Sequence, residues 1–299
     1  MVTPSHVARL RWNFANVGNA PGGGFRDLTF PITVHEMDPL DRGWYFAMQW
    51  RWSNASAYPM AYTGLQPRAD GTCFTPFSLF GKGGEVVDTE RCKGGADFGD
   101  GITCNNVPGI RDFRLGRRYL LTVDQDADDE RLHRGWVTDE TTGLSAATGA
   151  WRIPAGHGGV TGYHVGFLEY YRALASCEQL PYARVTYGRP YSTSGAKTGQ
   201  LEDPAERADK PCAGKSGFRW VRNPDGSVTV EVGHRRRTRP TPPPAPRPRV
   251  EVAVNVTVGG LPRPPLRAQP AGHDPGGGSP DPAAELVDPP PTSRRTTTP

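Results

Sequence analysis

Five residues in two nearby segments have side chains suited to carbohydrate recognition. Tyr45, Gln49 and Arg51 lie at odd positions of one segment, and Tyr62 and Gln66 lie in the next. An aromatic ring offers an apolar face with a polar edge, and amide and guanidinium groups supply hydrogen bonds for sugar hydroxyls. Because side chains alternate between the two faces of a strand, the spacing predicts one shared glycan-binding face. An ordinary solvated or half-covered sheet face is the alternative, since polar residues usually face solvent.

A second set of residues could hydrolyse a glycoside. Glu36 and Asp38 would share one face of a strand end, and a protonated and an ionised carboxyl suit the acid and nucleophile roles. Retaining glycosidases on concanavalin-like sandwiches carry an E-x-D-x-x-E or E-x-D-x-E strand. Here Asp41 replaces the last glutamate and Pro39 interrupts the strand. We therefore expect a solvated turn of acids, and we keep a hydrolase that uses Glu36 and Asp38 as an alternative.

The acidic run from Asp124 to Glu130 has the alternating oxygen spacing of a calcium loop. An EF-hand needs glycine where Asp129 stands and a bidentate glutamate where Gly135 stands, so an EF-hand is excluded. We expect an acidic hairpin tip that keeps a sheet edge soluble. A looser calcium site is the less favoured alternative. The sequence predicts no metal site and no cofactor.

The element that positions the candidate glycan face is the segment 44–52. Its even positions hold Trp44, Phe46, Met48, Trp50 and Trp52. Strict alternation of this kind predicts a strand whose even face packs against a thick apolar core. Left in water, that apolar area would be an aggregation hazard, so any recognition should come from the odd face. The expected core also includes Leu10, Trp12, Phe30, Ile32, Leu65, Leu79, Leu121, Val123 and Trp136.

Other short strands follow at regular intervals, with Gly, Pro, Asn and Asp between them. The segment 223–226, Asn-Pro-Asp-Gly, predicts a hairpin between strands over 218–221 and 227–232. The segment 165–175 fits a strand and a helix about equally. The pattern as a whole predicts an all-β fold, an antiparallel β-sandwich of the jelly-roll, concanavalin-like kind.

The C-terminal part of the 299-residue chain differs from the rest in composition. From His234 onward there is no aromatic residue, and ten Arg against five acids give a net charge of +5, whereas residues 1–233 carry −1. We expect a sandwich domain over 1–233 and a Pro- and Arg-rich linker and disordered tail over 234–299. The alternation of Val250 to Val258 predicts one strand within that tail. The folded part has no basic excess that would indicate nucleic-acid binding.

Five cysteines bear on the cellular compartment. Cys92 with Cys104 and Cys177 with Cys212 are plausible disulfides, which would leave Cys73 unpaired; free buried thiols are the alternative. Disulfides require an oxidising compartment, so we expect an extracytoplasmic or secreted protein. The N-terminal residues lack the basic and apolar regions of a signal peptide, so either this sequence lacks its export signal or the protein is cytoplasmic. No apolar run is long enough to span a membrane.

Several motifs resemble an uncharacterised bacterial domain-of-unknown-function family whose members carry a YF…GYFGIQ…FSVW progression. The matching residues are Trp44-Tyr45-Phe46-Ala47-Met48, Tyr62-Thr63-Gly64-Leu65-Gln66 and Phe77-Ser78-Leu79-Phe80, with weaker likeness at 119–123, 135–137, 167–169, 177–178 and 187–188. The resemblance spans about residues 25–190, and Thr63 departs from the usual aromatic. It implies a concanavalin-like or jelly-roll sandwich, often in exported proteins near carbohydrate-associated modules. It supplies no established catalytic residue.

Together these features favour a non-enzymatic, extracytoplasmic, lectin-like module whose partner is a glycan. A glycoside hydrolase is the first alternative. A structural or partner-binding domain, in which the Pro-rich tail is the working part, is the second. We expect neither nucleic acid nor membrane as a partner, and the sequence does not indicate an oligomeric state.

Overall fold

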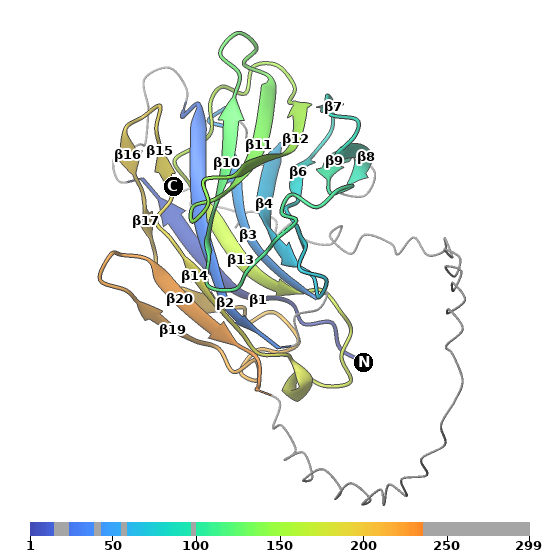
Figure 1. Ribbon diagram of the computed structural model, residues 1–299, viewed down its shortest axis with the longest axis vertical. Coiled ribbons are helices and arrows are strands. Elements are labelled where there is room, and N and C mark those ends of the chain that lie inside the picture. The colour runs from blue at the N-terminus through green and yellow to red at the C-terminus, as the bar shows by residue number, and fades with distance from the viewer. Residues whose placement is uncertain (15–23, 39–42, 55–58, 97–99, 236–299) are drawn as a thin grey trace, which may run out of the picture. The chain divides into compact units, whose positions relative to one another are not determined.

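The fold is an all-β sandwich of two antiparallel sheets, as the sequence predicts (Figure 1). The computed structural model describes residues 1–14, 24–38, 43–54, 59–96 and 100–235. Every strand pairing within the two sheets is antiparallel. Within these ranges the helical content is one 3₁₀ turn, η1 (Cys177–Gln179), and no helix is long and apolar enough to cross a bilayer.

Sheet I carries the segment with the candidate glycan face. Its strand order is β17 (Gln200–Leu201), β1 (Ser5–Asn13), β13 (Tyr163–Tyr170), β3 (Trp44–Arg51), β4 (Met60–Pro67), β6 (Phe77–Phe80), β9 (Gly101–Cys104) and β8 (Cys92–Ala96). Two short strands extend it, β18 (Ala205–Glu206) beside β1 and β5 (Cys73–Phe74) beside β4.

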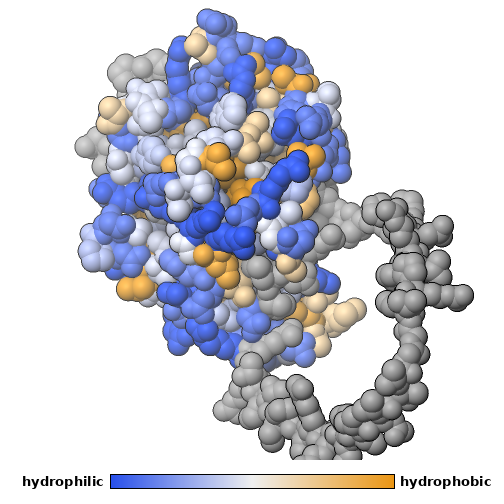
Figure 2. Space-filling model, viewed as in Figure 1, coloured by the Kyte–Doolittle hydropathy of each residue, from blue (hydrophilic) through white to orange (hydrophobic). Residues whose placement is uncertain are grey.

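Sheet II covers one face of sheet I. Its order is β19 (Arg219–Arg222), β20 (Val228–Val232), β14 (Ala183–Tyr187), β2 (Asp27–Met37), β10 (Arg118–Gln125), β11 (Leu132–Asp139), β12 (Ser145–Arg152) and β7 (Glu85–Val86). The pair β15 (Tyr191–Ser192) and β16 (Lys197–Thr198) attaches to β2. The side of the molecule seen in Figure 2 is mostly hydrophilic, with apolar residues scattered over it.

The apolar wall of β3 faces the space between the sheets. Its even-numbered side chains are buried, and Trp50 stacks on Phe30 of sheet II at 6.1 Å and on Phe77 at 5.8 Å. The odd side chains of β3 point to the opposite, outer face of sheet I. The burial of these side chains confirms the prediction that the even face of residues 44–52 packs against the core.

Trp136 is the exception among the expected core residues. It is 37% exposed, because the buried residues on either side of it, Gly135 and Val137, occupy inward positions of β11. The alternation then turns Trp136 outward, opposite Thr122 of β10 and Ala147 of β12. The prediction of a core role for Trp136 is wrong, because the inward face of β11 carries residues 133, 135 and 137, and position 136 falls on the outer face.

Several local expectations are settled by the strands and disulfides. The segment 163–170 is strand β13, so the strand interpretation holds there over the helical one, and residues 223–226 connect β19 to β20 as a hairpin. Cys92–Cys104 and Cys177–Cys212 are disulfides, and Cys73 is a buried free thiol. The strand expected over 250–258 lies outside the described residues.

Candidate functional site

All five predicted glycan-contact residues come to the outer face of sheet I. Tyr45, Gln49 and Arg51 alternate along β3, and Gln49 lies directly opposite Tyr62 of β4 in the strand register. Gln66 lies four residues further along β4, so it shares the face of Tyr62. The strand pairing thus brings together residues that are up to 21 positions apart in the sequence.

The centre of this face is buried, in contrast to the open platform expected. Tyr45 is 1% and Tyr62 4% exposed, and both rings pack edge-on against each other and against Phe167 of β13. Ala47 and Phe80 complete this second apolar cluster, which we call the outer cluster. The two tyrosine rings therefore support the face rather than present it to a ligand.

One end of the same face remains accessible. Tyr163 of β13 is 52% exposed, and the Arg51 guanidinium donates a hydrogen bond to its hydroxyl. The guanidinium carbon also lies 4.9 Å from the centre of the Tyr163 ring, which is a cation–π contact. This pair, the Arg51–Tyr163 platform, offers an aromatic ring and guanidinium donors side by side. Sequence reasoning missed Tyr163, although its alternation with Val165 and Phe167 was visible.

The far end of Gln66 is bound to a neighbouring arginine. Arg68 donates to the Gln66 side-chain oxygen at 3.1 Å and to its backbone oxygen at 2.9 Å, and its guanidinium lies over the Phe74 ring at 4.9 Å. A ligand would have to compete with Arg68 for that amide. Gln66 is therefore held in place by its own strand end.

A row of buried polar residues crosses the outer face next to the outer cluster. In the register, Glu169 of β13 lies opposite His6 of β1 on one side and Tyr45 of β3 on the other. Glu169 is 5% exposed, and His6, equally buried, stacks on Phe167 with ring centroids 4.1 Å apart. Burial, together with the positive charge of Arg207, lowers the pKa of His6 to about 3. Such buried ionisable groups outside a main core are candidates for function.

The second predicted set, Glu36 and Asp38, lies at the end of β2. Glu36 accepts hydrogen bonds from Arg235 at 2.6 Å and from Arg184 at 3.1 Å. The Arg235 hydrogen bond above all holds the pKa of Glu36 below its usual range. A glycosidase acid needs a raised pKa to stay protonated, so these contacts argue for a structural ion pair. Asp41 lies outside the described residues.

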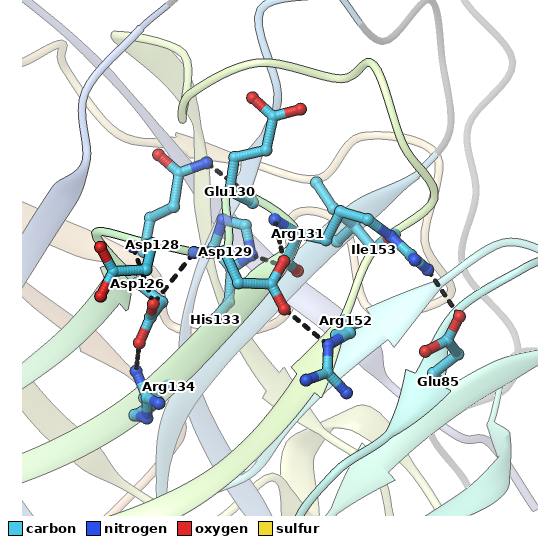
Figure 3. Close-up of polar contacts among 11 residues, drawn as sticks. Glu85, Asp126, Asp128, Asp129, Glu130, Arg131, His133, Arg134, Arg152 and Ile153 are labelled. Carbon is cyan, nitrogen blue, oxygen red and sulfur yellow. Dashed lines mark hydrogen bonds and ion pairs between the residues drawn. The ribbon is translucent and has the colours of Figure 1, made fainter.

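The acidic run between β10 and β11 forms a hairpin tip, as expected, and two of its carboxylates, Asp126 and Asp129, are bound by arginines (Figure 3). Asp126 accepts from Arg134 and from the backbone N–H groups of Asp128 and Asp129. Asp129 accepts from Arg152 at 2.7 Å. No cluster of three or more His, Cys, Asp or Glu side chains suited to a metal occurs in the described part of the chain.

The comparisons with known proteins match structures but no sequence family. No protein-family model matches the chain, and no curated protein does. The resemblance to the uncharacterised bacterial family therefore assigns no membership. Two solved structures of similar overall fold are scytalido-glutamic peptidase with a transition-state-analogue inhibitor and SCP-B, an eqolisin-family peptidase, with the tripeptide Ala-Ile-His. The first has a TM-score of 0.44, 11% identity and coverage of 78% of this chain and 99% of that one. The second has a TM-score of 0.41, 10% identity and coverage of 77% of this chain and 98% of that one. The likeness is one of β-sandwich architecture, and no activity or site residue is assigned by it.

Proposed function

We propose that this protein is a non-enzymatic glycan-binding module and that the glycan binds at the Arg51–Tyr163 platform. The observation that carries the proposal is that the Tyr163 ring is exposed and that the Arg51 guanidinium lies against it. A sugar ring can stack on the accessible aromatic surface while its hydroxyls accept hydrogen bonds from Arg51. The two disulfides fit the oxidising surroundings expected of an extracytoplasmic lectin.

The buried residues of the predicted site serve this platform from behind. Tyr45 and Tyr62 pack with Phe167, whose strand also carries Tyr163. This packing fixes the relative position of β3 and β13, and hence of Arg51 and Tyr163. A preformed site loses less ordering entropy on binding than a flexible one. Tyr45, Tyr62, Gln66 and Gln49, which is only 8% exposed, are thus positioning residues in the proposal, and Arg51 and Tyr163 are the contacts.

A glycan array with the full-length protein, with and without calcium, tests the proposal. We expect a hit whose affinity falls about tenfold or more in Tyr163→Ala and in Arg51→Gln, because each removes a direct contact. Trp136→Ala is the matched control, since Trp136 is an exposed aromatic on the outer face of sheet II. A blank array under both conditions, or binding lost in Trp136→Ala and kept in Tyr163→Ala, would overturn it.

A second candidate is hydrolysis by acid–base chemistry centred on Glu169. The buried row of His6, Glu169 and Tyr45 favours it, because a carboxyl removed from water outside the main core is a common feature of active sites. Panels of polysaccharides and peptides, assayed from acid to neutral pH, would detect it. Activity should vanish in Glu169→Gln and persist in Glu36→Gln. Loss of activity in Glu36→Gln alone would instead support the Glu36 and Asp38 hydrolase.

A further inference from the structure

A cavity of about 340 Å³ lies between the loop that follows β9 and the hairpin of β11 and β12. The loop contributes Val107, Ile110 and Arg111, and the hairpin contributes Val137, Leu144 and Ala146. Its volume falls at the lower end of the range of small-molecule sites. The cavity shares no lining residue with the outer face of sheet I.

Backbone hydrogen bonds fix both walls of this cavity. Ile110 exchanges two of them with Cys73, at 2.8 and 3.1 Å, so the loop is attached to β5. On the other wall, the Asp139 N–H donates to the Leu144 carbonyl at 2.9 Å. The site is therefore preformed, and a ligand would not have to order it.

The walls are largely apolar, and one large apolar side chain at the opening is left in water. Leu144 is 74% exposed at the tip of the hairpin. Val107 and Ile110 are half-buried on the opposite wall, and Val137 forms part of the core beneath. An apolar body seated between these side chains would remove that surface from water, which favours binding.

Three acids and three arginines line the opening, so their formal charges balance, but the arginines differ in how they are paired. Glu90 pairs with Arg91 at 3.2 Å, and Asp139 pairs with Arg117 at 2.7 Å. Asp112, the third acid, pairs with Arg114 at 2.6 Å, outside the cavity lining. Arg111 is exposed and makes no hydrogen bond or ion pair with any of the residues that the structure describes. The Arg111 guanidinium therefore keeps donors with which an anion at the opening can form charge-assisted hydrogen bonds.

We propose that this cavity binds a small carboxylate with an aliphatic or aromatic body. The body lies against Val107, Ile110 and Leu144, and the carboxylate accepts hydrogen bonds from the Arg111 guanidinium. Guanidinium–carboxylate pairs are often bidentate, which gives the cavity a preference for carboxylates over alcohols and amines of the same size.

Calorimetric titration of the full chain with hexanoate, octanoate and 3-phenylpropanoate tests this assignment, each against the matched primary alcohol and primary amine. We expect saturable binding of the carboxylates that is about tenfold tighter than that of the alcohols. Arg111→Gln should remove that preference and leave alcohol binding unchanged. Arg219→Gln is the matched control, because Arg219 is exposed on β19 and neither lines the cavity nor pairs with a residue that does.

A second variant tests the apolar wall without touching the core. Leu144→Glu, on the exposed hairpin tip, should weaken octanoate binding about tenfold by removing apolar contact and adding a like charge. The assignment is overturned if no carboxylate binds saturably, if amines bind as tightly as carboxylates, or if Arg111→Gln binds octanoate as the parent does. These outcomes are independent of the glycan proposal, because Arg51 and Tyr163 are intact throughout.

Discussion

Both ring nitrogens of His133 form hydrogen bonds inside the core. Its side chain is fully buried, Nε2 accepts a hydrogen bond from the Trp52 indole at 3.0 Å, and Nδ1 lies 3.1 Å from the Arg131 carbonyl oxygen. The ring also stacks on Trp151. These contacts fix the tautomer with the proton on Nδ1, which donates to Arg131, so this histidine has a structural role.

Replacing His133 should show the cost of leaving the Trp52 indole without an acceptor. We expect His133→Leu to lower the free energy of unfolding by about 1–3 kcal/mol, because a buried donor loses its partner. His133→Gln should lose less, since its amide oxygen can accept. Urea denaturation followed by tryptophan fluorescence measures both, with His157→Gln as a half-exposed control. A leucine variant as stable as the parent would contradict this role.

For single residues, the sequence predicts which side chains share a strand face better than it predicts which of them are buried. The five bulky side chains of residues 44–52 are inside, as their alternation indicates, but Trp136 is outside. Residue size suggested that Trp136 belongs to the core, whereas the alternation along β11 turns His133 and Val137 inward and Trp136 outward. No local pattern around His133 predicts its hydrogen bond with Trp52, which lies 81 positions away in the sequence.

Strand β4 depends on a glycine where two strands approach closely. A Cβ added to Gly64 would lie 2.2 Å from the Phe46 carbonyl oxygen and 2.7 Å from the ring of Tyr45. The first neighbour is backbone and cannot move away easily. Gly64 therefore allows β3 and β4 to pair while the Tyr45 ring lies across β4 in the outer cluster.

We expect Gly64→Ala to destabilise the fold by about 1–3 kcal/mol, the usual cost of overpacking. Gly94→Ala in β8 is the matched control, because a Cβ there meets no atom within 4 Å. Removing a strand glycine at an open site should be neutral or slightly stabilising. Thermal unfolding of the two variants separates the cases, and equal midpoints would argue against the close approach.

Strands and turns follow from local patterns, but the outer cluster does not. Alternation and the Asn-Pro-Asp-Gly turn predict β3 and the β19–β20 hairpin from a few neighbouring residues. The burial of Tyr45 and Tyr62 requires Phe80 and Phe167, which arrive from other strands. The five residues expected to contact a glycan do share one sheet surface, but the exposed end of that surface, at Tyr163, depends on long-range pairing that the sequence does not display.

The molecule as a whole should lose stability in mild acid. Burial lowers the pKa of His6 to about 3 and of His133 to about 4, whereas both titrate near 6.5 in an unfolded chain. Between these values the unfolded chain binds more protons than the folded one, so the free energy of unfolding falls as pH falls from about 6.5. The loss from His133 ends near pH 4, and that from His6 near pH 3.

Urea titrations at a series of pH values check this sign. His133→Gln should flatten the decline between pH 6.5 and 4, because glutamine does not titrate. The contributions of His6 and of His164, whose pKa burial lowers to about 4, would remain in that variant. A parent protein whose stability is constant or rises over this interval would contradict the burial of the two neutral imidazoles.

The buried thiol of Cys73 has a consequence for the way the chain acquires its covalent connectivity. Disulfide exchange needs an accessible thiolate. Burial raises the pKa of the Cys73 thiol, so in the folded protein Cys73 does not attack either disulfide. While the chain is unfolded, all five sulfurs compete. Pairing of β5 with β4 therefore protects the two disulfides. Once Cys73 is enclosed, its thiol cannot exchange with Cys92–Cys104 or Cys177–Cys212 until the fold opens again.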